Sequence, residues 1–461
     1  MSERVLPEGW VLASIDQVSI KGEQRKPDAA EQFIYVDIGS IDRESKVIAS
    51  PQRLSGSDAP SRARKVISVG DVLVSLTRPN LNAVALVGKE YDGQIVSTGF
   101  EVIRPVGVDS RFVFFLVRGQ AFIDAISGRV QGALYPAAKS SDVKGYQFPL
   151  PPSEEQKAIA DKLDELLAQV NNLKARLDTI PAILKRFRQS VLAAAVSIGL
   201  PDPSLSYQSS REGVELGSLL LTSFDGPFGS KLKTSDYTGA GVGVSRLENI
   251  RHLWFDGSKK TCISEEKYEE LKGNKLEKDD VLFSSFVDEE VRVCLFPYEG
   301  YKYINKADCF CLRADREQIV PKFLMFLLAS HGSYMQIKAH VQGVTRPRVN
   351  LKVLKSLKFK VPGVEEQVEI VRRVDQLFAF ADQIEQQVAN AQARVDTLTQ
   401  SILAKAFRGE LTAEWRAENP ELISGEKSAE ALLERIKAEK ARPQPAGRGH
   451  KRKSRQASLP V

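Results

Sequence analysis

The sequence is poor in the residues that enzymes most often use for catalysis or metal binding. Among 461 residues there are four histidines and four cysteines. No two histidines have the spacing of metal ligands, and the cysteines include a single Cys-x-Cys, at 309–311, without a second pair. Because a structural metal site normally needs two such pairs, we expect reduced cysteines in strands and no metal centre.

Several nucleotide-binding and catalytic motifs are also missing. No Gly-x-x-x-x-Gly-Lys-Ser/Thr sequence occurs, which excludes a P-loop. The Asn-Pro-Glu at 419–421 lacks the second proline and the aromatic residue of an adenine methyltransferase motif. The Asp-Glu-Glu cluster at 288–290 has no lysine two positions after either glutamate, as a restriction-type nuclease would need. We therefore expect a chain that is not an enzyme by itself, with no catalytic residues and no cofactor of its own.

Long hydrophobic runs are absent as well. The longest, at 112–117 and 323–329, are far too short to cross a bilayer, and the N-terminus has no apolar stretch of the secretory type. We expect a cytoplasmic protein with no membrane partner. The length exceeds that of one ordinary core, so two or three domains are expected. The net charge of +6 is compatible with nucleic acid without proving it.

One long stretch occurs twice. Residues 154–196 and 365–407 both open on Glu-Glu-Gln and both contain Gln-Ser-(Val/Ile)-Leu-Ala, at a constant offset of 211 residues. In each copy apolar residues recur at alternating steps of three and four, which predicts a coiled-coil helix. Two such helices can bury their seams against each other. The predicted seam is Leu163, Leu166, Val170, Leu173, Leu177, Leu184 and Phe187, with Val374, Leu377, Ile384, Val388, Val395 and Leu398.

The repeat extends upstream of the two helices. The offset of 211 holds back to about residue 110, where the apolar pattern predicts a helix in each half. Further upstream the halves correspond only loosely, as in Gly-Asp-Val-Leu at 70–73 and Asp-Asp-Val-Leu at 279–282. Short runs of branched and aromatic residues between Gly, Pro and Asp predict strands there. Ser153 with Gln156 predicts a capping box that opens the first long helix. The pattern indicates one scaffold carrying two variable modules.

Loops in both modules carry side chains that bind phosphates and base edges. Arg346 and Arg348 are the best individual candidates, because they flank Pro347 after a Gln-Gly turn. Any one of these residues could instead be an ordinary solvated surface charge. The candidates are Arg25, Lys26, Arg62, Arg64, Lys65, Arg78, Asn80, Gln131 and Lys139 in the first module, with Lys231, Lys233, Arg246, Lys259, Lys260, Gln342, Arg346 and Arg348 in the second.

These features together resemble the specificity subunit of Type I restriction–modification systems. Two β-rich modules alternate with two repeated helices, each entered through Pro-x-x-Glu-Glu-Gln or a close variant. Asp-Gly-Pro-Phe-Gly-Ser at 225–230 and Phe-Arg-Gly-Glu-Leu at 407–411 add to the likeness, which covers nearly the whole chain. One departure is Gly-Ala-Leu-Tyr-Pro at 132–136 in place of the Gly-Val-Thr-Arg-Pro at 343–347, which weakens the expected DNA contact of the first module.

The resemblance implies an α+β fold with an internal pseudo-two-fold repeat. Two β-rich α/β target recognition domains are separated and joined by two long helices that form an antiparallel coiled coil. The expected domains are a first target recognition domain (1–150), a central repeated spacer helix (151–200), a second target recognition domain (201–360), a distal repeated spacer helix (361–411), and a short helix with a basic disordered tail (412–461).

The resemblance also implies a function. Each domain would read one half of a bipartite, asymmetric target in double-stranded DNA, and the helices would set the spacer. The chain would dock two methyltransferase subunits and motor–nuclease subunits, and these partners would bring S-adenosylmethionine, ATP and Mg²⁺. The residues leave one alternative open: a non-enzymatic coiled-coil adaptor whose two modules bind peptide or carbohydrate.

Overall fold

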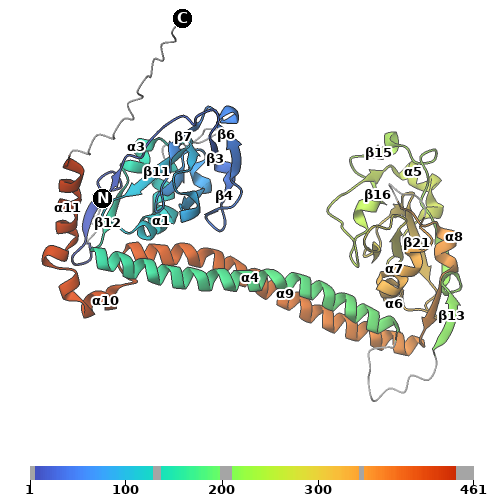
Figure 1. Ribbon diagram of the computed structural model, residues 1–461. Coiled ribbons are helices and arrows are strands. Elements are labelled where there is room, and N and C mark those ends of the chain that lie inside the picture. The colour runs from blue at the N-terminus through green and yellow to red at the C-terminus, as the bar shows by residue number, and fades with distance from the viewer. Residues whose placement is uncertain (1–5, 128–136, 198–209, 342–346, 443–461) are drawn as a thin grey trace, which may run out of the picture. The chain divides into compact units, whose positions relative to one another are not determined.

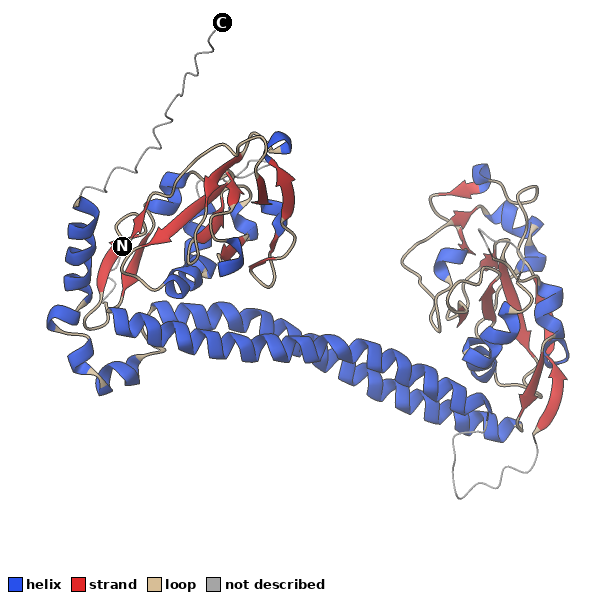
Figure 2. Cartoon of the chain, viewed as in Figure 1, coloured by secondary structure: helices blue, strands red, loops and turns tan. Residues whose placement is uncertain are grey.

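The computed structural model describes residues 6–127, 137–197, 210–341 and 347–442. The chain forms two compact units. Unit 1 comprises residues 1–176 and 391–461, and unit 2 comprises residues 177–390. Each unit holds one β-rich module together with part of both long helices, α4 (Ser153–Ser197) and α9 (Val364–Phe407) (Figures 1 and 2). Within the described residues, no helix is long and apolar enough to span a membrane.

The module of unit 1 contains two four-stranded sheets, ordered β6-β3-β10-β7 and β2-β11-β8-β9, and a two-stranded pair β1-β12. A short hairpin, β4-β5, stands beside them. The strands are β1 Val11–Ser14, β2 Ser19–Ile20, β3 Gln32–Val36, β4 Ile41–Asp42, β5 Val47–Ile48, β6 Gln52–Ser55, β7 Ala63–Val66, β8 Val72–Ser75, β9 Val84–Leu86, β10 Ile95–Ser97, β11 Phe100–Pro105 and β12 Gln147–Leu150. The helices are α1 Ser110–Arg118, α2 Gln120–Ser127, α3 Ser140–Lys144, α10 Ala413–Glu418 and α11 Ala429–Ala441.

The module of unit 2 repeats this plan, with sheets ordered β15-β17-β16-β20 and β14-β21-β18-β19 and a pair β13-β22. The strands are β13 Arg211–Glu215, β14 Leu220–Phe224, β15 Tyr237–Thr238, β16 Val242–Ser245, β17 Cys262–Ile263, β18 Val281–Ser284, β19 Val293–Leu295, β20 Tyr303–Asn305, β21 Cys309–Ala314 and β22 Lys358–Val361. The helices are α5 Glu265–Glu270, α6 Pro321–Ala329, α7 His331–Lys338 and α8 Leu351–Ser356.

The two modules share their topology well beyond what the sequence suggests. Each has one parallel strand pair, β3–β10 and β16–β20, among otherwise antiparallel pairs. The Asp of the Gly-Asp-Val-Leu motif makes the same contact in both. Arg104 donates two hydrogen bonds to Asp71, of 2.8 and 2.7 Å, and Arg313 donates two of 2.8 Å to Asp280. Both carboxylates are buried. The modules are therefore structural repeats, except that the fourth strand of one sheet lies at opposite ends: β7 pairs with β10 in unit 1, whereas β15 pairs with β17 in unit 2.

The coiled coil predicted from the heptads is confirmed, and so is the antiparallel direction that the family resemblance implies. In unit 1, Leu163 near the start of α4 belongs to the same core as Leu403 near the end of α9. In unit 2, Leu192 near the end of α4 shares a core with Val374 near the start of α9. Figure 1 shows the two helices side by side. Because each helix start meets the other helix end, the pair runs antiparallel.

Most predicted seam residues are buried or half-buried, and two are not. Leu173 is 46% exposed and Leu398 is 41% exposed. Leu167, outside the predicted seam, is buried, whereas its predicted neighbour Leu166 is half-buried. A straight helix repeats every 3.6 residues and drifts from a strict 3.5-residue seam, so the buried face moves by one position. Fewer apolar side chains are therefore buried between the two helices where Leu173 and Leu398 lie.

The predicted capping box at Ser153 is wrong. The Gln156 side chain accepts a 3.0 Å hydrogen bond from the backbone N–H of Asp109 and donates one of 2.8 Å to the carbonyl of Pro151. Gln367, its repeat in α9, likewise accepts from Val320 at 2.7 Å and donates to the carbonyl before α9. Both glutamines are fully buried. The third residue of each Glu-Glu-Gln thus ties a long helix to the chain that enters α1 or α6.

Candidate nucleic-acid interface

Two loops occupy equivalent places in the modules. Loop 76–83 joins β8 to β9 in unit 1, and loop 285–292 joins β18 to β19 in unit 2. Each loop pairs with the segment that precedes a short helix, through an isolated bridge between Thr77 and Ala137 or between Phe286 and Arg348. The next residue of that segment also donates its backbone N–H to the loop start in both modules, at 2.8 and 2.9 Å. Each loop is therefore held at both ends on a sheet.

Loop 76–83 exposes polar side chains on a constrained backbone. Thr77, Arg78 and Asn80 are exposed. Arg78 and Asn82 adopt left-handed φ values of 49° and 46°, which are uncommon without glycine and concentrate at functional sites. The Asn82 side chain donates to the carbonyl of Val117 at 2.8 Å, and Lys46 donates to the carbonyl of Asn82 at 2.6 Å. The hairpin β4-β5, which carries Lys46, therefore helps to fix the loop.

Two cations in unit 1 are held in surroundings that disfavour charge. Burial, with repulsion from Arg118, lowers the pKa of Lys46 to about 8. Burial lowers the pKa of Arg118 to about 10. The Arg118 guanidinium lies over the rings of Phe114 and Phe115, at 5.0 and 5.4 Å from their centroids. An anion such as a phosphate would stabilise the charged form of both groups.

In unit 2 the exposed Arg348 is positioned from two sides. Its guanidinium lies 4.2 Å from the centroid of the Phe286 ring, and its Nη2 is 3.5 Å from an Asp308 oxygen. Asp308 has a left-handed φ of 70° and accepts a 2.9 Å hydrogen bond from Ser285. Its backbone N–H donates to Asp225 at 2.9 Å. The motif at 225–230 thus supports Arg348 through Asp308, and burial raises the pKa of Asp225.

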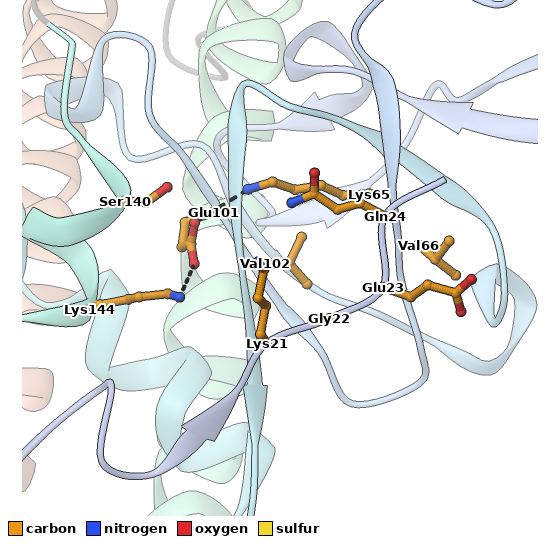
Figure 3. A pocket seen from close by; sticks show the side chains of 10 residues that line it. All are labelled: Lys21, Gly22, Glu23, Gln24, Lys65, Val66, Glu101, Val102, Ser140 and Lys144. Atoms are coloured by element: carbon orange, nitrogen blue, oxygen red, sulfur yellow. Dashed lines mark hydrogen bonds and ion pairs between the residues drawn. The ribbon is translucent and has the colours of Figure 1, made fainter. Parts of the chain in front are cut away.

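Some predicted DNA contacts are already paired inside the protein. Lys65 donates to the carbonyl of Phe100 at 2.6 Å and lies 3.3 Å from Glu101, which is buried between Lys65 and Lys144 (Figure 3). These residues line a cavity of about 240 Å³. Arg25 makes two hydrogen bonds of 2.6 Å to Glu31. Much of the charge of Lys65 and Arg25 is therefore balanced within unit 1.

The structure places the remaining candidates on module surfaces. Arg246 is half-buried and lies 3.5 Å from Glu248, and Arg64 is also half-buried. Gln131, Gln342 and Arg346 lie outside the described residues. The other candidates are exposed: Lys26, Arg62, Arg78, Asn80 and Lys139 in unit 1, and Lys231, Lys233, Lys259, Lys260 and Arg348 in unit 2. Their contact with DNA stays a prediction.

Several residues that shape these surfaces carry no signal in the sequence. Lys46 and Arg118 come from a hairpin and a helix near loop 76–83, and no motif marks either. Phe286 and Asp308 position Arg348 across separations of 62 and 40 residues in the chain, so its neighbours in sequence do not indicate them.

Comparison with known proteins decides the family. Residues 7–182 and 237–391 match the family described as "Type I restriction modification DNA specificity domain". The chain belongs to this family of Type I specificity subunits. This specificity subunit carries the matched region twice, and each copy covers most of one module. The resemblance inferred from its motifs is thereby confirmed.

Relatives match over nearly their full length. The StySPI specificity subunit of Salmonella potsdam is 35% identical over 96% of this chain and 97% of its own. The EcoKI specificity subunit of Escherichia coli K12 is also 35% identical, with the same coverage. The EcoBI subunit of Escherichia coli is 40% identical over 72% of each chain.

Two solved structures share the fold. The HsdS subunit from Thermoanaerobacter tengcongensis is 28% identical and superposes with a TM-score of 0.61 over 89% of this specificity subunit and 99% of that chain. A chain from a structure of the type I R-M system, concerned with complex assembly and conformational transition, is 28% identical with a TM-score of 0.69 over 88% and 99%. The α+β fold with two repeated modules is thus that of known specificity subunits.

Proposed function

We propose that this specificity subunit reads a bipartite, asymmetric target in double-stranded DNA. Each module contacts one half-site, and the helices α4 and α9 set the number of unspecified base pairs between them. The observation that carries the proposal is that the two modules share one fold but expose different side chains on equivalent loops. Loop 76–83 presents Arg78 and Asn80, whereas loop 285–292 presents Asp288 and Glu289 beside the separately supported Arg348.

These side chains suit different base edges. Arginine pairs with guanine, asparagine with adenine, and a carboxylate accepts a hydrogen bond from the N4 amine of cytosine. Two modules with one fold but different exposed groups are therefore expected to prefer different half-sites. The reaction itself belongs to partners: two methyltransferase subunits that use S-adenosylmethionine, and motor–nuclease subunits that use ATP and Mg²⁺. This subunit contributes recognition and spacing.

The proposal is tested by exchanging one module. Residues 1–150 are replaced by those of a specificity subunit with a different first half-site, and the subunit is assembled with its methyltransferase partner. The donor module must carry a tryptophan at the position of Trp10, because Trp10 contacts Glu155 of α4. We expect the first half-site to change while the second half-site and the spacer stay the same.

Salt dependence provides the second readout. Phosphate contacts release counterions, so the logarithm of the binding constant should fall linearly with the logarithm of the salt concentration. An adaptor that binds peptide or carbohydrate would show no such DNA affinity. An unchanged target after the exchange, or DNA binding independent of salt in the assembled complex, would contradict the proposal.

A further inference from the structure

A short hairpin in unit 2 presents a tryptophan to solvent. Trp254 lies in hairpin 250–255, whose ends are joined by a bridge between Ile250 and Phe255, and its side chain is 57% exposed. Tryptophan is the largest apolar side chain, and its burial stabilises a folded protein strongly. Unit 2 exposes other large apolar side chains as well, such as Tyr301 and Phe228, so the exposure of Trp254 matters only together with the backbone that holds it.

The hairpin is rigid. Arg251 donates its backbone N–H to the carbonyl of Trp254 at 3.1 Å, and Leu253 donates to the carbonyl of Val293 at 2.8 Å. His252 forms a bridge with Val293, and its Nδ1 lies 2.9 Å from the carbonyl oxygen of Val291. The exposed indole therefore stands on a backbone that is fixed to the edge strand β19.

The backbone at Leu253, directly before the exposed Trp254, has a strained conformation. Leu253 has a left-handed φ of 70°, which is rare for a bulky residue. Its side chain packs against the main hydrophobic core of unit 2. The strain thus coincides with a half-buried leucine followed at once by an exposed tryptophan. Strain of this kind persists where the surroundings fix it and clusters at functional sites.

The first module has the same arrangement. In hairpin β4-β5, Lys46 has a left-handed φ of 60° and is followed by Val47, which is 48% exposed. Both hairpins lie beside the strand that follows the equivalent loops, β9 in unit 1 and β19 in unit 2. The apolar residue at the exposed position differs between the modules, as expected of a position that contributes to recognition.

Charges around Trp254 favour a nucleic acid over a protein partner. Arg251 and Arg292 are half-buried, and each directly precedes a residue of the parallel bridge between His252 and Val293. The Arg251 guanidinium donates to Asp256 at 3.2 Å, so part of its charge is balanced within unit 2. Lys259 and Lys260 are exposed on the turn that follows, which Asn249 holds by a 2.9 Å hydrogen bond to the carbonyl of Lys259. Cationic groups beside an exposed aromatic ring are typical of nucleic-acid surfaces.

The neighbouring loop is not basic. Asp288 and Glu289 are exposed on loop 285–292. They lie close in sequence to Val291, whose carbonyl oxygen contacts His252 of the hairpin. A uniformly basic patch would indicate contact with the phosphate backbone alone. Mixed charges next to an aromatic side chain fit a surface that reaches bases, since carboxylates accept hydrogen bonds from cytosine.

We propose that hairpin 250–255 is a DNA-contact element in which the indole of Trp254 stacks against a base of the second half-site. The exposed Lys259 and Lys260 donate to phosphate oxygens beside it. The contact belongs to the class in which an apolar side chain wedges against a base step and partly unstacks it. This inference rests on the proposed DNA-reading function and names the residue that makes the contact.

The experiment uses the full chain assembled with its methyltransferase partner and a duplex bearing the target. Adenines in and beside the second half-site are replaced one at a time by 2-aminopurine, whose fluorescence rises when it is unstacked. The variants are Trp254→Ala and Trp254→Phe. Tyr301→Ala is the matched control, because Tyr301 is an exposed aromatic residue of the same unit, 67% exposed, that packs on Tyr298, which in turn contacts the base of the hairpin at Phe255.

We expect Trp254→Ala to weaken DNA binding by about tenfold and to remove the fluorescence rise at one position, without changing the salt dependence. Trp254→Phe should keep most of both signals, and Tyr301→Ala should match the wild type. Wild-type affinity and fluorescence in Trp254→Ala would overturn the inference. Loss of the methyltransferase subunit from the Trp254→Ala complex on size-exclusion chromatography would assign Trp254 to a protein interface and overturn it as well.

The experiment distinguishes a failure of the proposed DNA-reading function from a failure of the role of Trp254. If the wild-type complex binds no split DNA target, the proposed function fails, and this inference fails with it. If the wild-type complex binds such a target and Trp254→Ala binds it equally well, only the role of Trp254 fails. Thermal unfolding of each variant confirms that the exposed substitutions leave the fold intact.

Discussion

Glu155 and Glu366 hold the same place in the two Glu-Glu-Gln repeats but have different surroundings. Glu155 is fully buried and accepts hydrogen bonds of 2.7 Å from both Trp10 and Thr412. The Arg416 guanidinium donates to it as well. Glu366 is half-buried, and burial raises the pKa of its carboxyl. Among the residues that the structure describes, the first repeat thus fastens both the start of its module and the chain after α9 to a long helix, and the second does not.

The two glutamates form a matched pair for mutation. Glu155→Gln leaves the largely buried Arg416 without its counter-charge, and breaking a buried ion pair in this way costs about 3 kcal/mol. Glu366→Gln should change stability by less than about 0.5 kcal/mol, since it removes a charge that burial already disfavours. Urea unfolding of both variants checks this expectation. Equal effects at the two positions would contradict it.

Lys46 makes stability depend on pH. Its pKa is about 8 in the folded protein, below the ordinary value of 10.5. Between these values the unfolded chain binds more protons than the folded one, so stability rises as the pH increases from about 8 to 10.5. Lys46→Met removes this contribution. We expect the variant to gain in melting temperature relative to the wild type at pH 7, and that gain to shrink at pH 9.5.

The quantity to compare is the difference in melting temperature between the Lys46→Met variant and the wild type. Other groups titrate in both proteins, so their contribution cancels in this difference. Loss of the hydrogen bond from Lys46 to Asn82 shifts that difference by a constant amount at every pH. A difference in melting temperature that does not vary between pH 7 and 9.5 would therefore contradict the account.

At the scale of elements, the sequence predicted the helices better than the loops. The helices α4 and α9 could be predicted from their heptads, because the apolar pattern repeats over many turns and every apolar position lies on the same face of the helix. The strands were readable as apolar runs. Their equivalence was visible only at Gly-Asp-Val-Leu and Asp-Asp-Val-Leu, 209 residues apart, because strands of one topology tolerate many apolar residues. Contacts such as Asp71–Arg104 and Asp280–Arg313 extend it to further strands.

The candidate site was predictable only in part, for a related reason. Arg348 was singled out from its own neighbours in the chain, but Phe286 and Asp308, which position it, come from other elements. Lys65 looked like a free surface cation, because Glu101 lies 36 residues away. The exposure of Trp254 depends on the left-handed backbone conformation of Leu253, which no sequence pattern indicates. Side-chain type was visible in the sequence, whereas pairing and exposure were not.

The helix pair offers a prediction at this scale. In unit 2, Arg188 of α4 contacts Asp382 and Glu385 of α9, at 2.6 and 2.7 Å, which identifies 182–188 and 382–388 as facing heptads. Deleting both removes about 10 Å from each helix and keeps the seam in phase. With about 3.4 Å per base pair, we expect the target spacer to shorten by about three base pairs while both half-sites stay the same.

Deleting only one of the two heptads is the matched control. It shifts one helix against the other and should impair assembly rather than yield a new spacer. Sequencing of methylated DNA from cells that express each deletion gives the spacer directly. A target with its original spacer after the double deletion would show that the helices do not set it.

At the scale of the molecule, one fold is used twice with different exposed side chains. The repeated parts are those that hold the structure: the Asp–Arg pairs, the glutamines that anchor the helices, and the bridges at the loop ends. The parts that differ are on loops 76–83 and 285–292 and on the hairpins beside them. Under the proposed function, this division would let the specificity subunit keep its assembly while its modules read different half-sites.

The most direct measurement is a single-molecule methylome. DNA from cells expressing this specificity subunit with its cognate methyltransferase subunit is compared with DNA from cells lacking the specificity subunit. The account predicts new N6-methyladenine in one split motif, with two different halves on either side of a fixed gap. No new methylation, with the soluble complex present in the same cells, would contradict it.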